Sequence, residues 1–383
     1  MVESVSDARP VVIFVRGAAG SAEYAPRFAA QELAWKKAAG RAGAEWRTVP
    51  GGEIQNADNN LQPAAATVVP DASAAAAPAV VANGNGAAPG AGTGAGAGAA
   101  PAPGAAPGAG AGVDGVKQGG SDHALLEKIL TEIGKSGPAA VWIVLVGHGT
   151  WDGREARFNL EGPDLSAGEL AGWLKPLTRP VVVVNTSASS SPFVNILSGP
   201  GRIVISATRS GNERNYARFG EEMAASLEDP AADYDEDGQV TLLELFLRAS
   251  SRTAEFYLAE GRLLTEHALM DDNGDGKGTP ATFFRGLRAN VTAKDKAVPD
   301  GARSRLTALI PDAAARKMSP AQLSQRDLLE GEIDTLRAAK ATMAEDNYYL
   351  KLEGILRRLA ALELEPEPVP ERAPEPVPEN SPR

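Results

Sequence analysis

The sequence predicts an α/β fold in which a mostly parallel sheet is flanked by helices, with a helical appendage at its C-terminal end. Short uninterrupted apolar runs such as VVIFV, VWIVLV and VVVV have the length and composition of buried parallel strands. Helical sequence separates these runs, and strands that alternate with helices pair in parallel. From about residue 319 the alternation stops and the pattern becomes wholly helical.

The first part of the α/β domain spans residues 1–56. Residues 11–15 form the first predicted strand, and residues 45–49 form the second. Between them, a turn that contains glycine leads into a helix that continues to about residue 41. This helix carries three large apolar side chains: Phe28, Leu33 and Trp35.

Residues 57–120 have very low sequence complexity. Between positions 81 and 110, 26 of the 30 residues are Ala, Gly or Pro. Such a stretch has almost nothing to bury and cannot offset the entropy lost on ordering. Because the sequence on each side resembles part of one sheet, we predict a disordered insertion in a surface loop. A linker between two domains is the alternative.

The remainder of the α/β domain is predicted over residues 121–298. Ser121 or Asp122 can cap a helix at its start. Strands are predicted at 141–146, 181–184 and 203–205, with helical sequence between them. The apolar residues of the first helix are Leu125, Leu126, Ile129 and Ile133.

Residues 299–364 form the helical appendage, and residues 365–383 form a tail. Ser319 followed by Pro320 is a helix start, and two apolar stripes follow at helical spacing. We expect two antiparallel helices packed on each other or on the α/β domain; a partner-binding coiled coil is the alternative. The tail contains seven Pro and five Glu, which predicts a disordered, extended segment. The stripes are Leu329, Ile333 and Leu336, then Tyr349, Leu352, Leu356 and Leu359.

Composition excludes several classes of function. The net charge of −11 argues against a general nucleic-acid binder, and no apolar run is long enough to span a membrane. Cysteine is absent, which removes disulfides and thiolate chemistry, and three histidines are too few for a typical multi-histidine metal centre. The opening MVESVSDARP has no apolar core of a signal peptide. Since a processed chain would look the same, both an exported or periplasmic location and a cytoplasmic one stay open.

Two strand ends carry residues that could perform chemistry. His148 stands between two glycines directly after the strand at 141–146, and the Gly149 N–H could donate to a developing oxyanion. Ser187 lies 39 residues later in the turn NTSASSS, directly after the next predicted strand. Adjacent parallel strands would place both residues on one rim of the sheet, as a nucleophile beside a base. A structural histidine and a serine-rich loop that satisfies backbone groups are the alternatives, since only Asp152 lies nearby in sequence as an acidic partner.

These segments carry a resemblance to a known family. In order and spacing, VWIVLVGHGTWDG, VVVVNTSASSSPF and IVISATRSGNERNYARFG resemble the legumain branch of the caspase–legumain peptidase clan. VVIFVRGAAGSAEYAPRFAAQ is similar to the first strand and turn of that family. The resemblance covers roughly residues 11–49 and 121–258, about half of the chain. It implies a caspase-like sheet and a cysteine peptidase mechanism, with His148 as the base and the nucleophile at position 187.

The chain departs from the family at the nucleophile, because Ser187 stands where the cysteine belongs. A serine hydroxyl ionises far less readily than a thiol, so a site built for a thiolate should lose most of its activity. The resemblance therefore implies an inactive pseudopeptidase that binds or scaffolds an unknown protein or peptide. A peptidase or other hydrolase that uses Ser187 with His148 is the alternative. Arg27 lies near the position of the family's pocket arginine but is out of register.

The strongest motif is DYDEDGQVTLLE at 233–244, which matches an EF-hand calcium loop at every position. Gly238 provides the sharp turn, and helices are predicted at 219–227 and 242–258 on the two sides. Oxygen donors at alternating positions suit Ca²⁺, so calcium is the expected cofactor. The predicted ligands are Asp233, Asp235, Asp237, Gln239, Thr241 and Glu244.

A second acidic loop, DDNGDGKG, begins at Asp271. Asp271, Asn273 and Asp275 fit the first three ligand positions of the same motif. Thr282 stands where the bidentate glutamate should be, so the motif is incomplete. The loop is expected to pair with the first one, to bind calcium weakly, or to be a simple turn. His267, just before it, is assigned to packing or to a helix surface.

Overall fold

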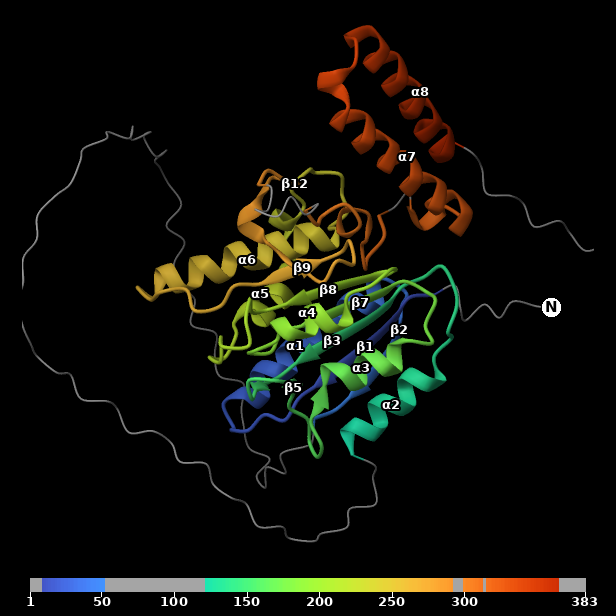
Figure 1. The fold of residues 1–383 in the computed structure, drawn as a ribbon. Coiled ribbons are helices and arrows are strands. Elements are labelled where there is room, and N and C mark those ends of the chain that lie inside the picture. Colours follow the sequence, from blue (N-terminus) through green and yellow to red (C-terminus); the bar gives the residue numbers. More distant parts are fainter. Residues whose placement is uncertain (1–8, 52–120, 292–298, 313–314, 365–383) are drawn as a thin grey trace, which may run out of the picture. The chain divides into compact units, whose positions relative to one another are not determined.

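A seven-stranded sheet organises the α/β domain (Figure 1), in a computed structural model that describes residues 9–51, 121–291, 299–312 and 315–364. Its strand order is β10-β9-β8-β7-β3-β1-β2. The predicted insertion at 57–120 and the predicted tail at 365–383 lie outside the described residues. The strands are β1 (Val11–Arg16), β2 (Glu45–Val49), β3 (Val141–Val146), β7 (Val181–Asn185), β8 (Arg202–Ser206), β9 (Leu269–Asp271) and β10 (Thr279–Pro280).

Helices connect the strands and continue beyond the sheet. Within the described residues, no helix is both long and apolar enough to cross a membrane. The predicted cap of the first helix after residue 120 is Ser121, whose side chain accepts the Ala124 N–H. The helices are α1 (Tyr24–Arg41), α2 (Asp122–Glu132), α3 (Ala167–Leu174), α4 (Ser191–Leu197), α5 (Phe219–Ser226), α6 (Leu242–Ala259), α7 (Pro320–Ala338) and α8 (Glu345–Leu364).

The sheet is mostly parallel, which confirms the predicted α/β class. Strands β2, β1, β3, β7 and β8 all pair in parallel, so the segments before and after residues 52–120 contribute to one sheet. At one edge, β9 runs antiparallel to β8, and β10 runs antiparallel to β9. These edge strands were not predicted. Nor were two small antiparallel sheets, formed by β4 (Gly149–Trp151), β5 (Ala156–Phe158) and β6 (Leu165–Ser166), and by β11 (Phe284–Arg285) and β12 (Arg288–Ala289).

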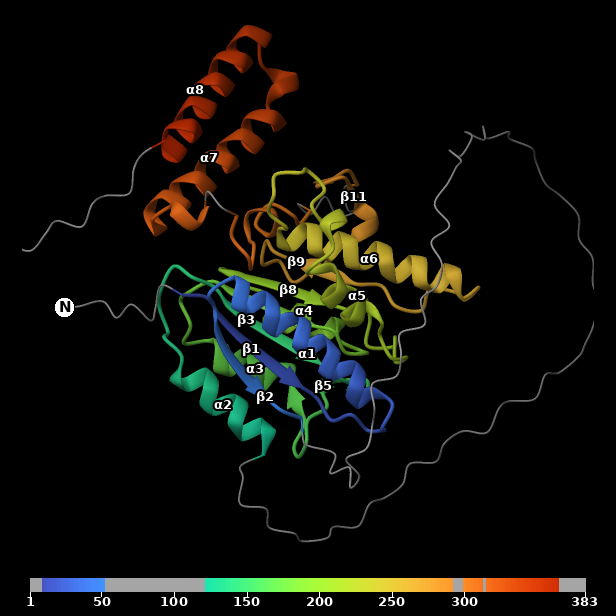
Figure 2. The ribbon, with the colours of Figure 1, turned by 180° about the vertical axis from the view of Figure 1, so that it is seen from behind.

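Helices cover both faces of the sheet. Because side chains alternate along a strand, Val12 and Phe14 of β1 enter one apolar core, while Val11 and Ile13 enter the other. The first core contains side chains from α1, α5 and α6, and the second contains side chains from α2, α3 and α4. Helices α2 and α3 lie in front of the sheet in Figure 1, whereas α1 lies in front in the opposite view of Figure 2.

Helices α7 and α8 form a hairpin with a small apolar core of its own. Leu329, Ile333 and Leu336 are buried in it, as their spacing predicts. The predicted stripe on α8 is half correct: Leu352 and Leu359 pack against the hairpin core, whereas Tyr349 and Leu356 are 50% and 48% exposed. The face of α8 that contacts α7 runs through Tyr348, Leu352, Ile355, Leu359 and Leu362.

Candidate functional site

The ends of β3 and β7 come into direct contact. The two strands are parallel neighbours, and Leu145 pairs with Asn185. A Cβ atom on Gly149 would lie 2.3 Å from the Ala188 carbonyl oxygen and 2.6 Å from the Ser187 Oγ. Only glycine allows this approach, so the structure brings Gly149 and Ser187 together at one rim of the sheet. His148, the residue before Gly149, lies at the same rim.

Ser187 is almost fully enclosed at this rim. Ser187 is only 1% exposed to solvent. The Ser187 Oγ donates a hydrogen bond to the Asn185 Oδ1 at 2.7 Å, and the Ser187 N–H donates to the same oxygen at 3.0 Å. Ser189, in the same turn, has a backbone φ of 55°, which residues other than glycine rarely adopt. The turn is therefore held in one conformation in which Asn185 is the acceptor of the Ser187 hydroxyl.

His148 is oriented by a backbone carbonyl and by aromatic rings. Its Nε2 donates to the Ala19 carbonyl oxygen at 3.2 Å, so Nδ1 is the acceptor nitrogen of the neutral ring. The imidazole makes edge contacts with Tyr24, at 4.5 Å between ring centroids, and with Phe28 and Tyr216. Burial lowers the pKa of His148, and the hydrogen bond to Ala19 opposes this shift. Such a ring is kept neutral near pH 7, as a base would need.

We expect His148 to titrate below pH 6.5, the ordinary value for histidine, because burial disfavours its charged form. The unfolded chain then takes up this proton at a higher pH than the folded chain, so the residue's contribution to stability is lost as pH falls below about 6.5. Two-dimensional NMR of the imidazole carbons measures the midpoint, with His148→Gln to assign the signal. A midpoint at or above 6.5 would contradict the enclosed environment.

The side chains of Asp152 and Arg27 bind groups other than His148 and Ser187. The Asp152 carboxylate accepts the backbone N–H groups of Arg154 and Glu155, so it closes a local turn. Arg27 forms an ion pair with Glu221 at 3.3 Å. The carbonyl of Ala19 was not foreseen, because a backbone group leaves no signal in the identity of its residue.

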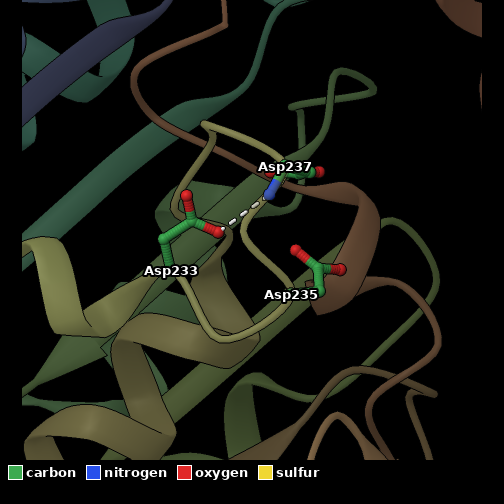
Figure 3. A group of neighbouring side chains, drawn as sticks. All are labelled: Asp233, Asp235 and Asp237. Atoms are coloured by element: carbon green, nitrogen blue, oxygen red, sulfur yellow. Dashed lines mark hydrogen bonds between the residues drawn. The ribbon is translucent and has the colours of Figure 1, made fainter.

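The loop at 233–244 brings three of its predicted ligands together. Carboxylate oxygens of Asp233, Asp235 and Asp237 lie within 4.8 Å of one another (Figure 3). The Asp237 N–H donates to the Asp233 Oδ1 at 3.1 Å, and the Gly238 N–H donates to the Oδ2 at 2.9 Å. Gly238 has a φ of 85°, as the sharp turn requires. The loop thus presents converging oxygen donors.

The remaining predicted ligands of this loop are placed differently. The Glu244 carboxylate is buried, and it accepts hydrogen bonds from the N–H and the Oγ1 of Thr241. Thr241 and Glu244 form a capping box at the start of α6, and Glu244 also accepts the Tyr234 N–H. The side-chain oxygen of Gln239 accepts the Asp312 N–H, a contact that does not involve the carbonyl predicted as its ligand at position 7 of the loop. Glu244 is therefore fixed at the base of the loop, outside the group of three converging aspartates.

Negative charge accumulates within the loop, and backbone N–H groups that donate to Asp233 and Asp237 offset it only in part. Burial raises the pKa of Asp237, and the negative charges of Asp235 and Asp233 add to the rise. Burial also raises the pKa of Glu244, with a smaller contribution from Asp235. A cation bound among these oxygens would offset both effects.

The second acidic loop connects β9 to β10 as a hairpin, not as a helix–loop–helix unit. Asp271 is 1% exposed, and its carboxylate accepts the N–H groups of Gly274 and Gly276 at 2.8 Å each. Asn273 and Asp275 accept backbone N–H groups two residues further on. This hydrogen bonding is that of an Asx turn, which was one of the alternatives, and weak metal binding stays a prediction.

Comparison with known proteins gives structural similarity only. No protein-family model and no curated protein matches the chain. Among solved structures, the chain is similar to the Drosophila initiator caspase Dronc, with a TM-score of 0.38 and 10% identity over 71% of this chain and 83% of that one. It is also similar to caspase-1 from Spodoptera frugiperda, with a TM-score of 0.36 and 7% identity over 70% and 87%.

Proposed function

We propose that the chain is a calcium-binding, caspase- or legumain-like protein that has no peptidase activity and acts by binding or scaffolding a protein or peptide. The observation that carries the proposal is the state of Ser187. It follows β7, the neighbour of the strand that precedes His148; its hydroxyl is enclosed, and its proton is directed to Asn185. A nucleophile needs an exposed oxygen whose proton can pass to a base.

The chemistry of serine supports the same conclusion. A thiol beside a histidine can exist as a thiolate near neutral pH, whereas a hydroxyl must lose its proton during attack. His148 is held by Ala19 and by aromatic rings, with its acceptor nitrogen at Nδ1, which supports the proposal of a base at this position. The proposed protein would keep this base but lack a nucleophile that the base could activate without a third group.

The loop at 233–244 fits calcium in the chemistry of its donors. Asp233, Asp235 and Asp237 offer hard carboxylate oxygens that already converge, and Ca²⁺ takes six to eight oxygen ligands in general. When bound, the ion would neutralise the repulsion among these carboxylates. Asp233 would continue to order the loop through the N–H groups that it accepts, and Glu244 would exchange hydrogen bonds of the α6 cap for the ion as the last predicted ligand.

Peptidase activity is expected to be absent from the native chain. We expect Ser187→Cys to be labelled only slowly by a small thiol-directed probe, because position 187 is enclosed, and Ser187→Cys with His148→Gln to be labelled at least tenfold more slowly still. Mass spectrometry of the intact chain measures the labelling, and fluorogenic peptides with varied side chains measure turnover. Equal labelling of the two variants would show that His148 does not act on position 187.

The alternative is a hydrolase that uses Ser187 with His148, and the oriented, neutral imidazole is the observation that favours it. The two proposals differ in the effect of Ser187→Ala. Turnover of any peptide or ester by the native chain that is abolished by Ser187→Ala would establish the hydrolase. Turnover that persists in Ser187→Ala would not use Ser187 as nucleophile and would contradict this hydrolase.

A further inference from the structure

Helix α8 has a second apolar stripe, which shares only Leu352 with the face that contacts α7. Tyr349, Leu352, Leu356 and Ala360 recur at intervals of three or four residues, so they share one side of the helix. Tyr349 and Leu356 are 50% and 48% exposed, and Ala360 is exposed as well. Only Leu352, at the border with the packed face, is partly covered. Exposed aromatic and aliphatic side chains in a continuous row mark an interaction surface.

An acid–base pair borders this stripe on the side away from α7. Glu353 and Arg357 are four residues apart on α8, and their side chains form an ion pair at 2.6 Å. Both are more than half exposed, so they are available to a partner. Their positions on the helix place them next to Leu352 and Leu356 and turned further from the packed face.

The arrangement is complementary to itself. When two identical helices pack antiparallel about a two-fold axis, each helix presents the same border of its stripe to the other. Residues before the axis on one helix then lie opposite residues after the axis on the other. The midpoint of the Glu353–Arg357 pair falls within one residue of the midpoint between Tyr349 and Ala360. One two-fold axis therefore places Glu353 opposite Arg357 of a second copy, and it also places the large Tyr349 near the small Ala360. Neither match requires the other, and they agree on one register.

We propose that the stripe Tyr349–Leu352–Leu356–Ala360 is a dimerisation surface on which α8 packs antiparallel against α8 of a second copy of this chain. Apolar contacts along the stripe supply the attraction, and two symmetric Glu353–Arg357 pairs set the register and orientation. The inference does not depend on the proposed calcium or pseudopeptidase function.

Sedimentation velocity of the full chain, from low micromolar to submillimolar concentration, tests the proposal. The native chain is expected to dimerise with increasing concentration. Leu356→Asp, which places a charge in the centre of the stripe, should remove the dimer over this range. Leu328→Asp on α7, where the leucine is 63% exposed, is the matched control and should dimerise like the native chain. A native chain that stays monomeric at every concentration would overturn the proposal.

Charge exchange tests the register. Glu353→Arg and Arg357→Glu each place like charges opposite each other in the dimer, and each should raise the dissociation constant at least about tenfold. A mixture of the two variants should form a heterodimer of about native affinity, since one chain presents two arginines and the other two glutamates. Neither variant keeps the ion pair within its own helix, so this rescue can arise only between chains. Single variants that dimerise like the native chain, or a mixture without rescue, would contradict this register and this surface.

Circular dichroism separates loss of the dimer from loss of the hairpin. Glu353, Leu356 and Arg357 are all exposed, so the packed core around Ile333 and Ile355 is expected to remain. Each variant should keep the helical signal and the melting temperature of the native monomer measured at low concentration. A variant that unfolds is replaced by Tyr349→Ser, which shortens the same stripe without a charge and should weaken the dimer in the same direction.

Discussion

Excess calcium is expected to raise the melting temperature of the chain by roughly 5–10 °C over its value in chelator. An ion that binds only the folded state stabilises it by about 2.7 kcal/mol at a hundredfold excess over the dissociation constant. For a domain of this size, each kcal/mol shifts the melting temperature by about 2–4 °C. The physical reason is the convergence of Asp233, Asp235 and Asp237, whose repulsion the ion would remove. Scanning calorimetry in calcium and in chelator measures the difference.

Three substitutions in the loop distinguish calcium binding from a general loss of charge. Asp235→Asn removes one converging carboxylate at an exposed position, so it should abolish most of the calcium response with little effect in chelator. Glu244→Gln should also weaken binding, but it disturbs the cap of α6 and should lower the melting temperature in chelator as well. Glu236→Gln is the matched control, because it removes the same charge at a position of the motif that supplies no ligand.

Isothermal titration calorimetry gives the number of ions. We expect one strong site per chain, since Thr282 leaves the second loop without a carboxylate at its last ligand position. Equal melting temperatures of the native chain in calcium and chelator, with no heat of binding, would show that residues 233–244 form an acidic turn. An equal loss of response in Glu236→Gln and Asp235→Asn would point to unspecific charge screening.

The central strands could be predicted because a strand buried on both faces is apolar at every position. Residues 141–146 form a fully buried strand within the predicted limits for this reason. Residues 45–49 (EWRTV) also form a strand within the predicted limits, but this one lies at the edge of the sheet and is only partly buried. The edge strands β9 and β10 have only three and two residues, and β9 ends at Asp271. A buried carboxylate breaks the apolar pattern, and its burial is possible because loop N–H groups satisfy it. Such a strand depends on tertiary hydrogen bonds that no local pattern encodes.

The phase of α8 could not be predicted from periodicity for a related reason. Tyr348 and Tyr349 are adjacent, as are Ile355 and Leu356, so two apolar stripes are offset by one residue. Periodicity finds both stripes but does not say which one contacts α7. In the structure, Tyr348 and Ile355 pack in the hairpin core, whereas Tyr349 and Leu356 remain exposed.

The candidate site was predictable in its position but not in its internal contacts. His148 and Ser187 were found because each follows a buried strand, and parallel neighbours end at the same rim. The hydrogen bonds from His148 to the Ala19 carbonyl and from Ser187 to Asn185 depend on how two turns meet. The sequence of side chains therefore predicts where the two residues lie, but it does not predict which groups they bind.

Gly149→Ala is expected to destabilise the chain by about 1–3 kcal/mol, because a side chain at this position overpacks a tightly closed contact. The added Cβ would lie 2.3 Å from the Ala188 carbonyl oxygen, and backbone cannot move aside as cheaply as a side-chain tip. Urea denaturation measures the change in the free energy of unfolding. Gly40→Ala is the matched control: this exposed glycine lies in α1 with nothing within 4 Å, so the same change should be neutral or stabilising.

A double-mutant cycle connects this loss of stability to the candidate site. The Cβ would also lie 2.6 Å from the Ser187 Oγ, so Ser187→Ala removes one of the two clashing atoms. Gly149→Ala should therefore cost less in a chain that already carries Ser187→Ala than in the native chain, with a coupling of about 0.5 kcal/mol or more. The clash with the Ala188 carbonyl should keep the cost above zero. Additive effects of the two substitutions would mean that residue 149 does not contact residue 187, and that His148 and Ser187 do not share one rim.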